Sequence, residues 1–181
     1  MPAWAPPAFC CCTGSVSGPA KAVGEVTTLP ALLERREGWR REGRRAVLTN
    51  GVFDLLHVGH LRSLQTARAL GELLIVAVNS DASARALKGP ERPIVPASER
   101  AELLAGLSCV DFAFVFDEPT AEGVVAALRP DVYVKGGDYD ASGKPLPEAA
   151  IVHGYGGEVV LAPLVEGLSS SNLIERIRDR G

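Results

Sequence analysis

Two histidines three positions apart are the residues of this 181-residue chain best suited to chemistry. His57 and His60 open a segment with helical periodicity, so one helical turn can aim both imidazoles the same way. Gly59, between them, lets a ligand approach the backbone closely. The free N–H groups and partial positive charge of a helix start suit a polyphosphate. Beside such an anion the imidazoles should favour their charged form and stabilise a leaving pyrophosphate.

Two other interpretations of this pair stay open. The imidazoles could bind a metal together with Asp54, and a histidine pair is often purely structural. However, both histidines lie where an apolar strand passes into a helix. Parallel sheets bind their ligands at the carboxyl ends of such strands, which favours the phosphate interpretation.

Strands and helices alternate from Arg45 to the end of the chain. Strands are expected at 46–49, 72–79, 110–116, 131–135 and 158–162, and helices at 59–70, 97–107, 120–128, 147–154 and 170–178. This alternation predicts an α/β fold, a Rossmann-like doubly wound parallel sheet of about five strands. The expected domain covers 45–181, an N-terminal helix covers 28–44, and a Pro-, Ala-, Gly- and Ser-rich tail, 1–27, is expected to be disordered.

Further polar residues cluster in the loops that should adjoin this site. Lys88 lies in a Gly- and Pro-rich segment, where a cation can clamp phosphates. Lys135 ends an apolar strand and is followed by two glycines, which is hard to explain by packing. Ser169–Ser171 precede the last helix and can cap it or bind phosphate there. Arg100 is either a surface residue or a hydrogen-bond anchor for a loop.

The segment Gly51–His60 (GVFDLLHVGH) resembles the signature of the nucleotidyltransferase superfamily with the H-x-G-H motif, which is cytidylyltransferase-like. Further segments resemble its heptose-1-phosphate adenylyltransferase branch; they are Asn79–Ser83, Leu87–Gly89, Arg92–Pro93, Val134–Tyr139 and Gly167–Ile174. Val52 replaces a cysteine of that branch, a conservative change. Ile174 stands where pantetheine-type enzymes carry an arginine, which argues against those branches.

The resemblance implies roles for individual residues. The implied catalytic residues are His57, His60, Lys88 and Lys135. The implied nucleotide-binding residues are Asn50, Gly51, Phe53, Asp54, Gly59, Arg92, Gly136, Gly137, Asp138, Ser169, Ser170 and Ser171. No protein ligand of a metal is implied, because Mg²⁺ would be bound mainly through the ATP phosphates and water. His153 and Tyr155 match nothing and are interpreted as surface or packing residues.

The implied reaction is transfer of AMP from ATP to D-glycero-β-D-manno-heptose 1-phosphate, giving ADP-heptose and pyrophosphate. Relatives are commonly homodimers, and a separate sugar kinase would make the substrate. A cytidylyltransferase acting on glycerol 3-phosphate or another polyol or amino-alcohol phosphate is the main alternative. A catalytically inactive nucleotide-binding module is another. A fragment of a class I aminoacyl-tRNA synthetase would need a Lys-rich second signature, which is absent from the sequence.

Composition excludes several other classes of protein. The net charge of −3 and the lack of an extended basic stretch argue against nucleic-acid binding. Three of the four cysteines are consecutive and none forms a C-x-x-C pair, so neither a disulfide framework nor a zinc site is predicted. The apolar runs are of strand length, and the first residues do not resemble a signal peptide. A cytoplasmic location is therefore expected.

Overall fold

The computed structural model describes residues 23–136, 146–162 and 169–179. In chain order the elements are β1 (Glu25–Val26), α1 (Leu29–Arg41), β2 (Ala46–Gly51), α2 (Val58–Arg68), β3 (Leu73–Asn79), α3 (Asp81–Lys88), α4 (Ala97–Ala105), β4 (Phe112–Phe116), α5 (Glu122–Leu128), β5 (Val132–Gly136), α7 (Pro147–Gly154), β6 (Glu158–Ala162) and α8 (Ser170–Arg178). Among these residues, no helix is long and apolar enough to cross a membrane.

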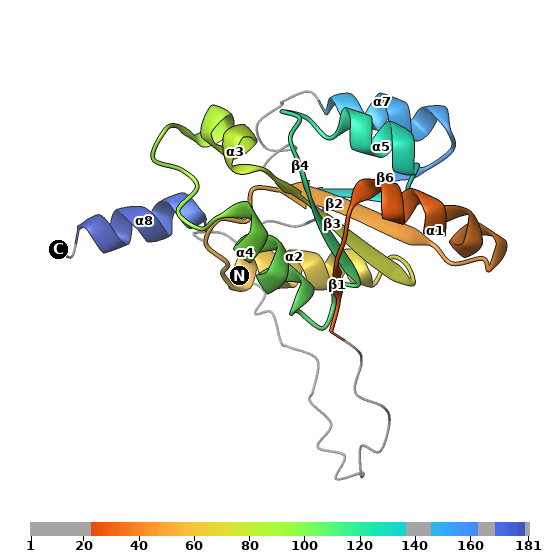
Figure 1. Cartoon of the computed structure of the whole chain (residues 1–181), viewed down its shortest axis with the longest axis horizontal. Coiled ribbons are helices and arrows are strands. Elements are labelled where there is room, and N and C mark those ends of the chain that lie inside the picture. Colours follow the sequence, from red (N-terminus) through yellow and green to blue (C-terminus); the bar gives the residue numbers. More distant parts are fainter. Residues whose placement is uncertain (1–22, 137–145, 163–168, 180–181) are drawn as a thin grey trace, which may run out of the picture.

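The strands form one parallel sheet in the order β1-β4-β3-β2-β5-β6 (Figure 1). The predicted α/β class and parallel sheet are confirmed, but the sheet has six strands and not five. The additional strand, β1, lies within the segment expected to be a disordered tail and pairs with β4 at the sheet edge. Gly24 permits this pairing, because a Cβ there would lie 2.7 Å from the carbonyl oxygen of Val110.

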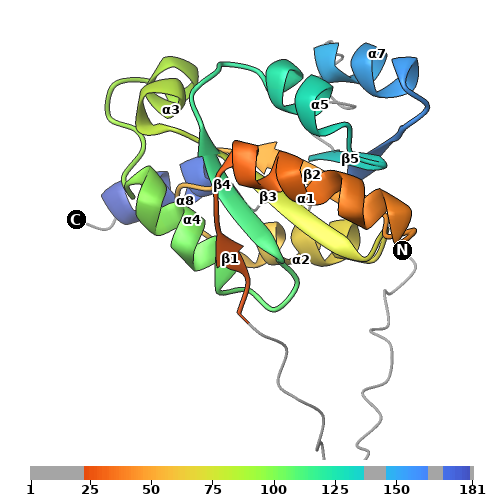
Figure 2. The same cartoon turned by 45° about the vertical axis from the view of Figure 1, so that its right-hand side comes forward.

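Helices cover both faces of the sheet, as a doubly wound fold requires (Figures 1 and 2). On one face, α1, α5 and α7 pack against alternate strand residues such as Leu48 and Ile75. On the other, α2 and α4 pack against the intervening residues, such as Val47 and Val76. Because successive strand residues point to opposite faces, the fully apolar run in β3 is buried on both sides.

The segment between β3 and α4 contains a helix, α3, where the sequence had indicated only a loop. Ser80 caps it by accepting a hydrogen bond from the Ser83 backbone nitrogen at 3.3 Å, and Asp81 supplies a negative charge in its first turn. Gly89, with φ of 100°, ends it. Lys88 is therefore the last residue of a helix.

Candidate active site

His57 occupies the start of α2, directly beyond the carboxyl end of β2. Its backbone is extended, and its Nδ1 accepts a hydrogen bond from the Gly59 backbone nitrogen at 3.1 Å, so it is the N-cap of the helix. A ring nitrogen that accepts carries no proton in the neutral imidazole. The proton of neutral His57 is therefore on Nε2, which can donate to a ligand.

The two imidazoles lie on the same side of the helix start, as the spacing predicted, and they stack on each other. Their ring centroids are 3.9 Å apart and the ring planes are inclined by 24°. The Phe53 ring lies against His60 with a centroid distance of 5.3 Å. Phe53 has φ of 49°, an unfavourable value for a bulky residue, and such local strain is typical of functional sites. Nδ1 of His60 is buried and has no hydrogen-bond partner among the described residues, which suits a ligand atom at that place.

Both histidines favour the neutral form in the free protein. Burial lowers the pKa of His57. Burial, and then the proximity of His57, lowers the pKa of His60 to about 4. The expectation of charged imidazoles concerned the site with a polyphosphate bound; in the free protein desolvation dominates, because no anion is present. A bound polyphosphate would act in the opposite direction.

This depressed pKa predicts a specific loss of stability in acid. In the unfolded chain His60 takes up a proton below its ordinary pKa of 6.5, whereas in the fold it does so only near pH 4. The free energy of unfolding should therefore fall by about 2 kcal/mol between pH 7 and pH 4.5 through this residue alone. Urea unfolding of the wild type and of His60→Gln measures it. The two proteins should show the same pH slope if the residue makes no such contribution.

Lys135 and Asn50 meet across the neighbouring strands β5 and β2. Nζ of Lys135 donates to Oδ1 of Asn50 at 2.8 Å, and the hydroxyl of Tyr133 donates to the same oxygen at 2.6 Å. Lys135 is buried and Tyr133 is fully so. The parallel register of β2 and β5 explains the meeting, because it sets Thr49 opposite Val134. A buried ammonium group is thereby held at the carboxyl edge of the sheet beside the first loop.

Tyr133→Phe tests whether this network positions the lysine. Removing the hydroxyl leaves Asn50 with the lysine alone and should lower the unfolding free energy by about 1 kcal/mol. The ammonium group of Lys135 is then held less firmly, and we expect kcat to fall several-fold while KM changes little. Steady-state kinetics together with urea unfolding separate the two effects. An unchanged kcat with reduced stability would assign Tyr133 to packing only.

Asp54 organises the first loop and does not face outward. Its side chain is 1% exposed. One carboxylate oxygen accepts from the backbone nitrogens of Ile94 and Val95 at 2.8 and 2.9 Å. The other oxygen accepts from Nε of Arg92 at 2.5 Å. These contacts support a role for Asp54 in orienting the loop, and Arg92 is positioned by it.

Arg100 connects the first loop to the segment before α4 through hydrogen bonds. It is fully buried in α4 and donates to the carbonyl oxygens of Val52 and Val95 and, at 2.7 Å, to the carboxylate of Asp81. It is therefore a loop anchor and not a surface residue. Val52 takes part through its carbonyl oxygen, which any residue supplies, so the replacement of cysteine at this position leaves the contact intact.

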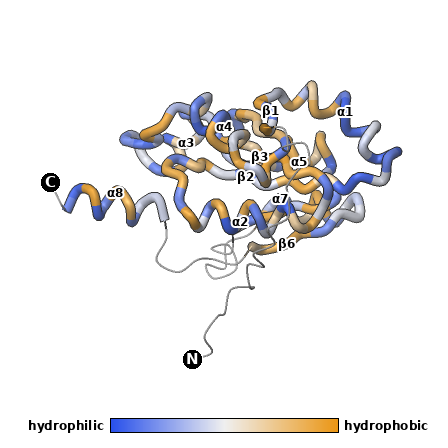
Figure 3. Tube along the Cα trace, turned by 90° about the horizontal axis from the view of Figure 1, so that it is seen from below, coloured by the Kyte–Doolittle hydropathy of each residue, from blue (hydrophilic) through white to orange (hydrophobic). Residues whose placement is uncertain are grey.

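The start of α8 lies against the first loop. Ser169 caps α8 by accepting from the Asn172 backbone nitrogen at 3.0 Å, and the Ser170 hydroxyl donates to the Leu55 carbonyl oxygen at 3.2 Å. Ser171 lines a cavity of about 490 Å³ that Lys88 and Arg92 also line. The rest of α8 extends away from the sheet, with apolar and polar residues mixed along it (Figure 3).

The predicted site residues thus divide into three groups. The first loop, the two histidines, Asn50 and Lys135 lie together, and Ser170 joins them through Leu55. Lys88 is exposed and lines the 490 Å³ cavity between the end of α3 and α8. Gly136 ends β5, whereas Gly137 and Asp138 lie outside the described residues.

Sequence reasoning missed Tyr133 as part of the site and left the role of Arg100 open. An aromatic residue within an apolar strand is indistinguishable from a core residue until the position of Asn50 is known. For Arg100, the only available signal was an arginine on the apolar face of a helix, next to Leu104.

Comparison with known proteins identifies similar sequences. The family described as cytidylyltransferase-like matches residues 48–176. The bifunctional protein HldE of Syntrophotalea carbinolica is 55% identical over 144 residues, which are 78% of this chain and 28% of that protein. HldE of Koribacter versatilis is 50% identical over 155 residues, covering 86% of this chain and 32% of that protein. The chain therefore spans only about a third, or less, of the curated relatives that it matches.

A solved structure is also similar. The crystal structure of the lipopolysaccharide core biosynthesis protein from Thermoplasma volcanium GSS1 is 30% identical, with a TM-score of 0.55. The match covers 68% of this chain and 98% of the Thermoplasma chain. The likeness thus extends over nearly the whole of the chain in that structure.

Proposed function

Since the chain belongs to the cytidylyltransferase-like family, we propose that it transfers a nucleoside monophosphate from a nucleotide triphosphate to a small phosphorylated substrate. The observation that carries this proposal is the stacked pair of His57 and His60 at the exposed start of a helix. Their donors and the helix N–H groups converge where a polyphosphate tail would lie. Lys135 adds a buried positive charge at the same sheet edge.

The reaction needs no enzyme nucleophile. An oxygen of the substrate phosphate attacks the α-phosphorus in line, and the bond from that phosphorus to the bridging oxygen breaks, releasing pyrophosphate. Catalysis is then positioning together with stabilisation of the charge that develops on the leaving group. In this scheme, Nε2–H of His57 and a ring N–H of His60 donate to the leaving phosphates. Lys135 neutralises charge near the α-phosphate.

The remaining proposed contacts surround this centre. Lys88 and Arg92, which line the cavity beside α8, would bind the phosphates of the nucleotide. Ser169–Ser171 would donate hydrogen bonds to the terminal phosphate from their hydroxyls and backbone nitrogens. The backbone of Asn50, Gly51, Phe53 and Gly59 would border the nucleotide, with Asp54 holding that loop in place. Gly136, Gly137 and Asp138 would contact the ribose or the sugar. These roles rest on the family membership together with the loop positions.

For the substrates, we propose ATP and D-glycero-β-D-manno-heptose 1-phosphate, with ADP-heptose and pyrophosphate as products. The motifs Leu87–Gly89 and Val134–Tyr139 support this choice, as does about 50% identity to several bifunctional HldE proteins. The reaction would take place in the cytoplasm and would require a sugar kinase activity to supply the 1-phosphate. A homodimer is the proposed assembly.

Magnesium would reach this site with the nucleotide. The described residues contain no group of three or more His, Cys, Asp or Glu that could hold a metal ion. Asp54, the carboxylate nearest in sequence to the histidines, already accepts three hydrogen bonds. The residues described therefore do not fit a protein-bound Mg²⁺, and the ion would be coordinated by phosphate oxygens and water.

A pyrophosphate-release assay tests the proposal. Each of ATP, CTP, GTP and UTP is combined with heptose 1-phosphate, glycerol 3-phosphate and ethanolamine phosphate. We expect rapid release only for ATP with heptose 1-phosphate, and ADP-heptose as the coupled product. Preference for CTP with glycerol 3-phosphate would instead establish the cytidylyltransferase alternative. Binding of ATP without release for any acceptor would indicate an inactive nucleotide-binding module.

A further inference from the structure

A second cavity lies at the opposite edge of the sheet, where the strands begin. Its volume is about 780 Å³, and its charged and aromatic lining residues are Arg40, Arg45, Arg129, Asp131, His153, Tyr155 and Glu158. These residues come from the ends of α1, α5 and α7, from the starts of β2, β5 and β6, and from the turn after α7. Because β2 has six residues, this cavity and the histidine pair are separated by about 17 Å or more along the strand.

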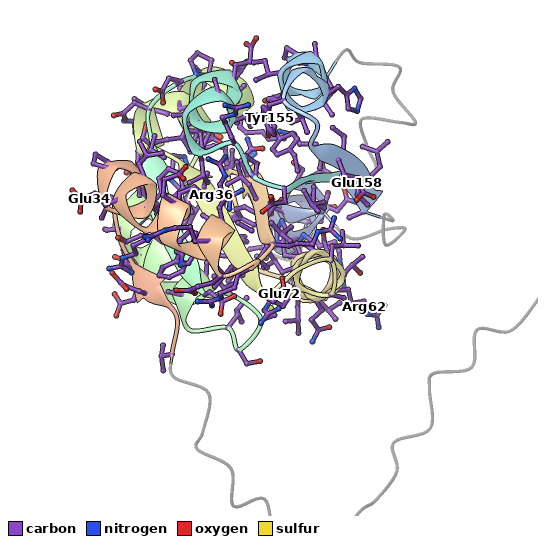
Figure 4. All side chains as sticks on the ribbon, turned by 90° about the vertical axis from the view of Figure 1, so that its right-hand side faces the viewer. Glu34, Arg36, Arg62, Glu72, Tyr155 and Glu158 are labelled. Atoms are coloured by element: carbon purple, nitrogen blue, oxygen red, sulfur yellow. The ribbon has the colours of Figure 1, made fainter. Side chains whose placement is uncertain are left out.

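Two buried polar atoms in this part of the molecule have no partner among the described residues, one on Tyr155, which lines the cavity, and one on Arg36, which does not. They are Nη1 of Arg36 and the hydroxyl of Tyr155. The other guanidinium nitrogens of Arg36 donate to the carbonyl oxygens of Leu128 and Arg129 and to Asp131, so the side chain is fixed and 97% buried. Figure 4 shows Arg36, Tyr155 and Glu158 at this edge of the molecule.

The charges around the cavity act on the Tyr155 hydroxyl. Burial raises the pKa of the Tyr155 hydroxyl to about 12, so it keeps its proton, while the charges of Arg36, Arg129 and Arg40 act against that shift. Both orphan groups can therefore donate a hydrogen bond at neutral pH. Buried donors normally find an acceptor, and the protein supplies none for these two among its described residues.

The conformation and surroundings of Arg129 also indicate that an acceptor is missing from this cavity. It ends α5 with φ of 47° and ψ of 63°, a left-handed conformation in which glycine is strongly preferred. Its guanidinium lies 5.1 Å from the centre of the Tyr155 ring. Among the described residues no carboxylate lies within ion-pair distance of it. A long cationic side chain is thus held where its backbone is strained, next to an orphan hydroxyl, which indicates a role for the side chain.

We propose that this cavity binds a small anion that carries a phosphate group, independently of the reaction at the histidine pair. The guanidiniums of Arg129 and Arg40 would pair with the phosphate oxygens, and Tyr155, which also lines the cavity, would donate through its hydroxyl. Of the two carboxylates at the site, Asp131 is paired with Arg36 and Glu158 with Arg45. The pair of Arg40 with Glu37 is exposed, so it contributes little and can open for a ligand.

The test is a titration of the full-length, ¹⁵N-labelled protein with inorganic phosphate, at an ionic strength held constant with chloride. The backbone amides of Gly156 and Gly157 report on this cavity and that of Gly59 on the histidine site. We expect saturable shifts at Gly156 and Gly157. Arg129→Gly should weaken this binding at least tenfold without unfolding the protein, since glycine suits the left-handed backbone. Arg40→Gln and Tyr155→Phe should weaken it as well.

A neighbouring arginine provides the matched control. Arg41 is exposed on the same helix as Arg40 and does not line the cavity, so Arg41→Gln should leave the affinity unchanged. Shifts confined to Gly59, shifts that do not saturate, or equal affinity in Arg129→Gly would each overturn the proposal. Shifts that do not saturate would mean that no anion binds specifically in this cavity, and equal affinity in Arg129→Gly would mean that Arg129 takes no part in the binding. None of these outcomes bears on pyrophosphate release, so this proposal and the proposed reaction can fail separately.

Discussion

His60→Ala should lower kcat by roughly 10²–10³-fold, and His57→Ala should have an effect of the same order. Each change removes one preorganised donor aimed at the position where negative charge develops on the leaving pyrophosphate. The two rings lie in contact, so neither can replace the other without rearrangement. His57 also caps α2, and its loss should cost about 1 kcal/mol of stability in addition. Pyrophosphate release at saturating substrates measures both variants.

A residue on the same helix controls for changes in α2 itself. Gln65 is exposed and distant from the helix start, so Gln65→Ala should retain wild-type turnover. The double variant His57→Ala/His60→Ala should lose less than the product of the two single losses, because both groups act on one leaving group. Near-normal turnover in either folded single variant would show that the assigned roles are wrong.

The order of strands and helices was predictable because it depends on local patterns. The apolar run of β3 reports its own burial, and in α4 the apolar residues Ala101, Leu104 and Ala105 mark the buried face of a helix. β1 was not predictable in this way, since two residues at a sheet edge show no periodicity. The helix α3 was not predicted because a Gly- and Pro-rich segment follows it. The residues that indicate it are the N-cap Ser80 and the acidic Asp81 in its first turn.

The parts of the site formed by residues close together in the chain could be predicted, whereas contacts between residues distant in the chain could not. The histidine pair and its helix start are local, and the stacked rings confirm the expected geometry. The partners of Asp54 are about 40 positions away, and Asn50 meets Tyr133 across 83 positions. Such partners are fixed by strand order and loop path, which composition and spacing do not determine. Tyr155 likewise was interpreted as a surface or packing residue, and its position beside a basic cavity became visible only in three dimensions.

Arg100→Leu should lower the free energy of unfolding by roughly 3 kcal/mol. The change leaves the carbonyl oxygens of Val52 and Val95 without their donor inside the protein. It also removes the partner of Asp81, whose carboxylate is 37% exposed and so remains partly hydrated. The loss should therefore lie at the lower end of the range for a broken buried ion pair. Urea unfolding of the variant measures it.

The same change should disturb the reaction through the loops that Arg100 holds. Val52 lies in the first loop, and Val95 belongs to the segment whose backbone nitrogens donate to Asp54, so kcat should fall at least tenfold even in protein that is still folded. Arg100→Lys keeps the charge but cannot reach three acceptors, and we expect an intermediate loss. Arg85→Ala, an exposed arginine on α3, should change stability by less than about 0.5 kcal/mol and leave kcat intact. If Arg100→Leu reduced stability but left kcat of the folded protein unaltered, Arg100 would support only the fold, and the first loop would hold its catalytic shape without it.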